Sequence, residues 1–151
     1  MSVNETPTAA SSTPTFALSA ALTWRTGLTS GAAALAANAV LFAVARAAGA
    51  DMLVRRDVSE PGMAIGLGTV AVTTLAPMLA GTLMLLAVRR WGPRSWRALA
   101  VIGLVVALAT APAPFTVLAG TTTQVALALM HVMSGVAWFA MVRRAVTRSV
   151  V

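Results

Sequence analysis

Residues 98 to 142 form one uncharged run of 45 residues, ALAVIGLVVALATAPAPFTVLAGTTTQVALALMHVMSGVAWFAMV. A helix that crosses a bilayer needs about 20 apolar residues, so this run is too long for a single crossing. It is divided at APAPF (111–115) and GTTT (120–123), because proline cannot continue a helix and glycine favours turns. The run therefore predicts two transmembrane helices, at about 96–111 and 123–142, joined outside the membrane.

Two more uncharged runs precede it. A run of 20 residues predicts a span at about 26–45, and a run of 28 residues predicts a longer, tilted span at about 61–88, kinked at Pro77. The first run is too long, and follows too few positive charges, for a cleaved signal peptide. The predicted fold class is therefore all-α: an integral membrane four-helix bundle, with a transmembrane domain over residues 24–144.

Composition supports a membrane protein. Of the 151 residues, 58% are hydrophobic and only 10% are charged, against about 25% charged in soluble domains. Residues 1–23 are mostly small, polar or proline, which predicts a disordered cytoplasmic tail, and residues 145–151 are expected to form a second tail. All basic residues are arginine, a bias that, with abundant alanine, valine and glycine, indicates a genome rich in G and C, such as that of an actinobacterium.

The same composition excludes several functions. The chain has no cysteine and a single histidine, so we expect no disulfide, no metal site and no cofactor. The net charge of +7 comes without any nucleic-acid-binding motif, so we expect no nucleic-acid partner. The partners expected are the lipid bilayer and either a second copy of the chain or another membrane protein.

The position of the arginines predicts the orientation, because Lys and Arg in short loops resist translocation. Four arginines lie in RRWGPRSWR (89–97), three follow the last span and Arg25 precedes the first, all on one side. We therefore expect the protein to lie in the inner (plasma) membrane, with both termini in the cytoplasm. The arginines predicted to contact anionic lipid, with Trp91 and Trp96 at the interface, are Arg89, Arg90, Arg94, Arg97, Arg143 and Arg144.

Small residues at helical spacing predict the helix contacts, because close backbone approach drives helix association in lipid. Gly27 and Gly31 lie on one face of the first span, and Gly62 and Gly66 form a GxxxG motif in the second. Gly135 is expected to have the same role in the last span. The outer loop GADMLVRRDVSEPG (49–62) mixes acids with arginines, and it is either a lid or partner-docking element on the bundle mouth or, as we favour, a solvated connector.

His131 is the residue most suggestive of function, because ionisable groups near the middle of a span are rare and usually face the bundle interior. It could relay protons or contact a ligand, or it could be a neutral histidine that hydrogen-bonds another helix, with Asn38 or a threonine as its partner. The candidate intramembrane polar site comprises His131, Asn38, Gln124, Ser134 and Thr73.

Two blocks, ALMHVMSG (128–135) and GADMLVR (49–55), resemble recurring features of an uncharacterised actinobacterial family of small four-span membrane proteins. The resemblance implies the topology over about residues 24–144. It implies no activity and no role for His131.

Three functions compete on this sequence. The first is a non-catalytic subunit or homo-oligomer, which nothing in the sequence opposes. The second is a small proton-coupled transporter or a lipid- or quinone-binding protein that uses His131, although the acids lie only in the tail and the outer loop. The third is a membrane enzyme, which we rank last because no second catalytic group is evident, and we expect no catalytic residue.

Overall fold

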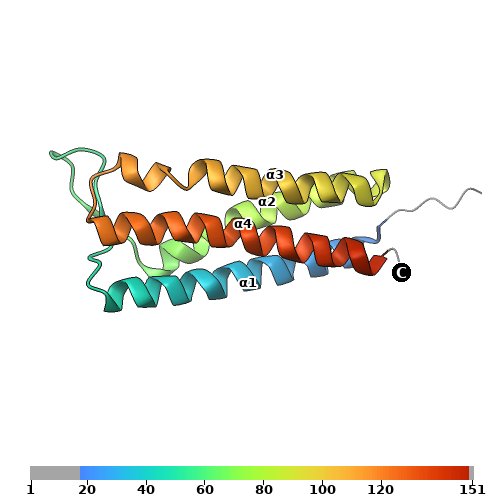
Figure 1. Cartoon of the computed structure of the whole chain (residues 1–151), viewed down its shortest axis with the longest axis horizontal. Helices are drawn as coiled ribbons and strands as arrows, with labels where there is room; N and C mark the ends of the chain where they lie inside the picture. The colour runs from blue at the N-terminus through green and yellow to red at the C-terminus, as the bar shows by residue number, and fades with distance from the viewer. Residues whose placement is uncertain (1–17, 150–151) are drawn as a thin grey trace, which may run out of the picture.

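The computed structural model describes residues 18–149, and within that range it consists mainly of four long helices (Figure 1). Each is long and apolar enough to cross a membrane, which confirms the predicted all-α class with four apolar helices. The elements are α1 (Ala20–Ala47), β1 (Leu53–Val54), β2 (Met63–Ala64), α2 (Leu67–Val88), the 3₁₀ turn η1 (Arg89–Trp91), α3 (Pro93–Thr110), the 3₁₀ turn η2 (Ala113–Thr116) and α4 (Thr121–Ser149).

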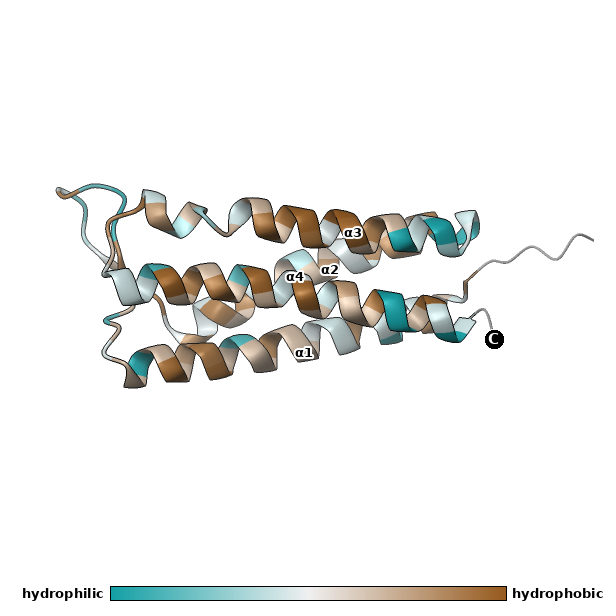
Figure 2. Ribbon diagram, in the orientation of Figure 1, coloured by the Kyte–Doolittle hydropathy of each residue, from teal (hydrophilic) through white to brown (hydrophobic). Residues whose placement is uncertain are grey.

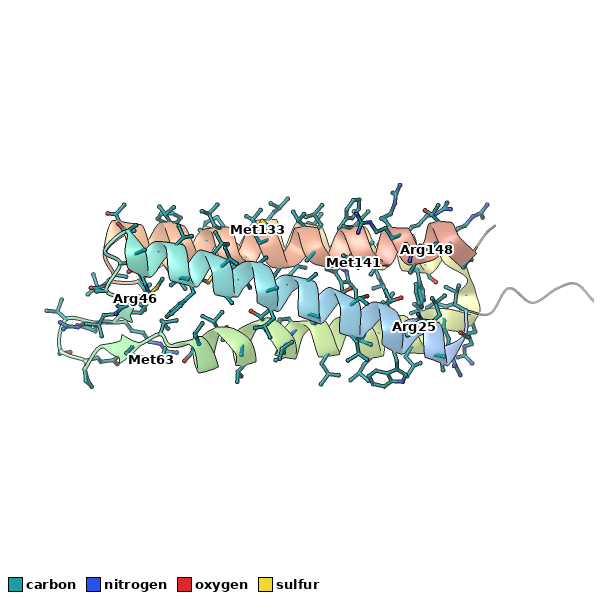
Figure 3. All side chains as sticks on the ribbon, turned by 90° about the horizontal axis from the view of Figure 1, so that it is seen from below. Arg25, Arg46, Met63, Met133, Met141 and Arg148 are labelled. Atoms are coloured by element: carbon teal, nitrogen blue, oxygen red, sulfur yellow. The ribbon has the colours of Figure 1, made fainter. Side chains whose placement is uncertain are left out.

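The helices run antiparallel to their chain neighbours, so the bundle has two chemically different ends (Figure 1). One end carries both described termini and η1; we call it the arginine-rich end. The other, the hairpin end, carries β1, β2 and η2. Figure 3 shows Arg25 and Arg148 at the arginine-rich end and Arg46 and Met63 at the hairpin end. Figure 2 shows apolar residues along the middle of the helices and hydrophilic residues towards both ends.

Packing around the bundle is uneven. Helix α4 packs extensively against both α1 and α3, and α1 packs against α2, whereas α2 and α3 make few contacts. Figure 3 shows α1 lying between α2 and α4. The order around the bundle is therefore α2, α1, α4, α3, with an open side between α2 and α3.

The largest buried cluster lies towards the arginine-rich end. Trp96 is fully buried there beside Leu85 and Val142, and its indole N–H donates to the Leu85 carbonyl at 3.3 Å. Trp96 was predicted to lie at the membrane interface; this hydrogen bond and the packing hold its ring inside the bundle, so the ring is not exposed. Trp91 is 67% exposed and remains available to an interface.

Several helix boundaries differ from those predicted. Helix α2 begins at Leu67, not near residue 61, because residues 63–65 pair with the preceding loop: the Ile65 N–H donates to the Met52 carbonyl at 2.8 Å. Helix α1 begins at Ala20, inside the predicted tail, and α4 continues to Ser149, through most of the predicted C-terminal tail. The predicted tail residues 1–17 and 150–151 lie outside the described residues.

The loop between α1 and α2 is an ordered hairpin. Leu53 pairs with Ala64 and Val54 with Met63, and Arg55 forms a bridge with Leu118 of the other connection at this end. Thr123, in the first turn of α4, accepts from the Met52 N–H at 3.2 Å and donates to the Asp51 carboxylate at 2.9 Å. These hydrogen bonds fix the loop against α4, so the loop is more ordered than a solvated connector would be.

Asp51 makes this anchoring sensitive to acid. Its pKa is lowered from the ordinary value of 3.8, most by the hydrogen bond from the Leu53 N–H and next by that from the Thr123 hydroxyl. A carboxylate with a lowered folded pKa stabilises the fold above its unfolded pKa, and that stability is lost as the pH falls through the folded pKa. We expect Asp51→Asn to remove part of the stability difference between about pH 6 and about pH 3.

Thermal unfolding of the detergent-solubilised protein at the two pH values measures this difference. Glu60→Gln is the control, because Glu60 lies in the same loop and its side chain makes no hydrogen bond among the described residues. An undiminished pH dependence in Asp51→Asn would exclude the proposed role of Asp51.

Candidate functional site

The open side of the bundle contains a deep groove with a volume of about 680 Å³, within the range of small-molecule sites. Helices α2 and α3 form its walls, and α4 with Asn38 of α1 forms its floor. We call it the α2–α3 groove. Its lining residues are Asn38, Ile65, Thr69, Val70, Thr73, Thr74, Pro77, Met78, Ala80, Gly81, Met84, Leu99, Ile102, Gly103, Val106, Ala107, Thr110, Pro114, Leu127, Met130, His131, Ser134, Gly135 and Trp138.

Trp138 lies between the two walls, towards the arginine-rich end. Its ring packs between Gly81 of α2 and Gly103 of α3, and a Cβ at Gly81 would lie 2.7 Å from the ring. The indole N–H donates to the Leu99 carbonyl at 3.1 Å, and the side chain is 5% exposed. Glycine is needed on both walls because any side chain there would collide with the indole. Trp138 thus joins three helices and limits the groove at this end.

The floor of the groove contains an incompletely paired amide. Asn38 is 2% exposed, and its Nδ2 donates to the Thr74 hydroxyl and to the Ser134 hydroxyl, both at 2.9 Å. Its Oδ1 is buried and has no hydrogen-bond partner among the described residues. Buried polar atoms in proteins are nearly always paired, and Asn38 lines the groove, so its unpaired amide oxygen indicates a place for a ligand group or a water.

His131 lies on the same floor, one turn of α4 before Ser134, and its side chain is exposed. Its Nδ1 is 2.8 Å from the Leu127 carbonyl. A carbonyl can only accept, so Nδ1 carries the hydrogen, and in the neutral ring Nε2 is then a free acceptor. Of the alternatives for His131, a hydrogen bond to another helix is not found among the described residues; the ring bonds its own helix instead.

Wall α2 adds a third polar group. Pro77 has no N–H, so the carbonyl of Thr73, one turn earlier, lacks its usual helical donor. The Thr73 hydroxyl does not replace that donor, because it donates to the Thr69 carbonyl at 2.8 Å. Thr73 and Pro77 are both exposed and both line the groove. The groove is therefore apolar with a few polar atoms, among them acceptors without a donor at Asn38, Thr73 and His131.

Charged groups are absent from the groove lining in residues 18–149: it contains no Asp, Glu, Lys or Arg. In the same range, no group of three or more His, Asp or Glu residues could hold a metal ion. The lining offers hydrogen-bonding groups and apolar contacts, with His131 as its one titratable side chain in residues 18–149.

The structure brings together four of the five residues of the predicted polar site. Asn38, Thr73, His131 and Ser134 line the groove, but Gln124 does not, because its side chain donates to the Val117 carbonyl at 3.0 Å near the hairpin end.

The glycines have different surroundings. Gly27 and Gly31 of α1 face α2, and Gly135 of α4 faces Ala107 of α3. Gly62 and Gly66 precede α2, so their GxxxG motif does not form a helix seam; Gly62 packs on the Leu53 side chain of the hairpin instead.

Sequence reasoning missed the α3 wall, made by Leu99, Ile102, Gly103 and Val106. The one available signal was Gly103, the single glycine of α3, in the middle of the helix. The predicted lipid-contacting arginines at 90, 94, 97, 143 and 144 are exposed, and Arg89 is half-buried. Arg143 also lies over the Phe139 ring, with its guanidinium carbon 5.5 Å from the centroid.

Four helices that are long and apolar enough to cross a membrane are typical of small multi-pass membrane proteins. Over residues 18–148 it matches a protein family described as "Family of unknown function (DUF6069)". The chain belongs to that family. No curated protein and no solved structure shows a significant match.

Proposed function

We propose that this protein is a non-catalytic, multi-pass protein of the plasma membrane, with both termini in the cytoplasm. The helices expose many large apolar side chains, among them Leu28, Val72, Leu83 and Ile102, which suits a lipid environment. Eight arginines belong to the arginine-rich end, whereas the three at the hairpin end are matched by three acids, so the positive-inside rule favours a cytoplasmic arginine-rich end. The use of arginine and no lysine supports an actinobacterial source.

We further propose that the protein binds a lipophilic molecule that enters the α2–α3 groove sideways from the bilayer. The observation that carries this proposal is the groove itself, which is apolar along its walls and ends in a buried amide with an unpaired oxygen. A well-formed apolar pocket with a few convergent polar groups is typical of small-molecule sites. A proton-coupled transporter has less support, because His131 is the one titratable side chain lining the groove in residues 18–149.

Native mass spectra of the full-length protein in mild detergent test the proposal, because they report retained molecules and oligomeric state together. Ala80→Trp should abolish retention of the molecule, since Ala80 is an exposed groove residue and an indole there would fill the groove. Ala76→Trp is the matched control: Ala76 is exposed on the same helix but does not line the groove.

The control should retain the molecule as the wild type does. The proposal would be contradicted if the wild type retained no molecule but formed a dimer, and if Ala80→Trp dissociated that dimer. The groove would then receive a helix of a second copy of the chain.

A further inference from the structure

The polar atoms of the α2–α3 groove restrict the chemistry of its ligand. We infer that the groove selects a neutral lipophilic molecule with a hydroxyl group, an alcohol or phenol, whose hydroxyl hydrogen is donated to Asn38 Oδ1 or His131 Nε2. This inference rests on the proposed function, since it names the class of molecule that the groove would bind.

The absence of charge on the groove lining gives the first step. The described lining contains no Asp, Glu, Lys or Arg that could pair with an anionic or cationic head group. An unpaired charge buried in apolar surroundings is strongly unfavourable. A phosphate, a carboxylate or an ammonium group is therefore a poor occupant, and the polar end of the ligand should be neutral.

Asn38 gives the second step. Both hydroxyls that contact its amide, those of Thr74 and Ser134, lie near Nδ2, and Oδ1 is left buried without a partner. The Ser134 hydroxyl hydrogen is already donated to the Met130 carbonyl at 2.8 Å, so Ser134 acts as an acceptor towards the amide. This network therefore favours the orientation of the Asn38 amide in which Nδ2 contacts the two hydroxyls. The amide atom without a partner is then the oxygen, which is an acceptor.

His131 gives the third step. Because its Nδ1–H is donated to Leu127, the free Nε2 of the neutral ring is also an acceptor. The Thr73 carbonyl, which lacks a helical donor because of Pro77, is a further acceptor in the groove wall. Acceptors left without donors call for a donor on the ligand, and the neutral donor that a membrane-soluble molecule commonly offers is a hydroxyl.

Photoaffinity labelling of the full-length protein in nanodiscs tests the inference with three probes. All three carry a mid-chain diazirine on the same long alkyl chain, and they differ only at the head: a primary alcohol, its methyl ether and its phosphate monoester. Peptide mapping shows whether the label lies on groove residues, and labelling as a function of probe concentration gives the relative affinity.

We expect the alcohol to label the groove at a concentration about fivefold lower than the ether, the difference made by one net hydrogen bond between neutral groups. The phosphate should label it least. His131→Phe, which keeps a ring at an exposed position, and Asn38→Leu should each reduce the preference for the alcohol. The wild-type comparison does not depend on either variant folding.

The two possible failures are distinguishable. Equal labelling of the groove by the alcohol and the ether, or strongest labelling by the phosphate, would overturn the inference and leave the groove as a binding site for lipophilic molecules. If no probe labels groove residues, the proposed function itself fails.

Discussion

Trp138→Ala is expected to lower the free energy of unfolding by about 3–5 kcal/mol, the range for truncating a buried tryptophan. The ring is in contact with Gly81 on α2 and Gly103 on α3, and neither glycine has a side chain that could move into the space left behind. The substitution also removes the hydrogen bond from the indole to the Leu99 carbonyl. Because α2 and α3 make few other contacts, this ring is a main connection between them.

Unfolding of the detergent-solubilised protein by increasing SDS, followed by circular dichroism, measures the loss. Trp91→Ala is the matched control: the same side chain is removed at a position that is 67% exposed, so a change below about 0.5 kcal/mol is expected. Similar losses in the two variants would show that Trp138 does not bridge the two walls.

Gly27→Leu is the second substitution with a large expected effect, a loss of about 3 kcal/mol or failure of α1 to pack on α2. A Cβ at Gly27 would overlap the Thr82 hydroxyl and methyl and lie 2.8 Å from the Thr82 Cβ. Rotation of the threonine side chain cannot remove the last of these contacts, because its Cβ is fixed to the backbone. The helices would have to separate.

Gly68→Leu provides the control on the same measurement. Gly68 lies in the first turn of α2, and a Cβ there would meet nothing within 4 Å. This variant should be as stable as the wild type or slightly more stable, because leucine has the higher helix propensity by about 0.5–1 kcal/mol. If Gly27→Leu unfolds as the control does, then α1 and α2 are not in close contact at this glycine.

The sequence predicts the four helices well because their signal is strong and local. Long uncharged runs mark the positions of α1, α3 and α4, but α1 begins earlier and α4 ends later than predicted, because these helices continue past Arg25 and Arg143. The start of α2 was predicted too early, because Pro61 to Gly66 is as apolar as a helix and its pairing with residues 52–54 depends on contacts that composition does not encode.

The candidate site was predictable in its residues but not in its geometry. Asn38, His131 and Ser134 are conspicuous as polar groups within apolar runs. That Asn38 would bond Ser134 while His131 bonds its own helix depends on the rotation of α1 against α4, which periodicity does not determine. The groove arises from the weak contact between α2 and α3, a property of the whole bundle that no single run of sequence contains.

The central place of α4 in the bundle has a consequence for the order of assembly. The helix that is synthesised last packs most extensively, against both α1 and α3. Until it leaves the ribosome, α3 has few contacts with the rest of the chain, and Asn38 can bond Thr74 but not Ser134. In the proposed membrane setting, α1 and α2 can pair early, whereas α3 must wait in the bilayer, held there by its hydropathy, until the C-terminal helix arrives. Chains that terminate before α4 would therefore lack the groove floor as well as the helix that holds α3 in place.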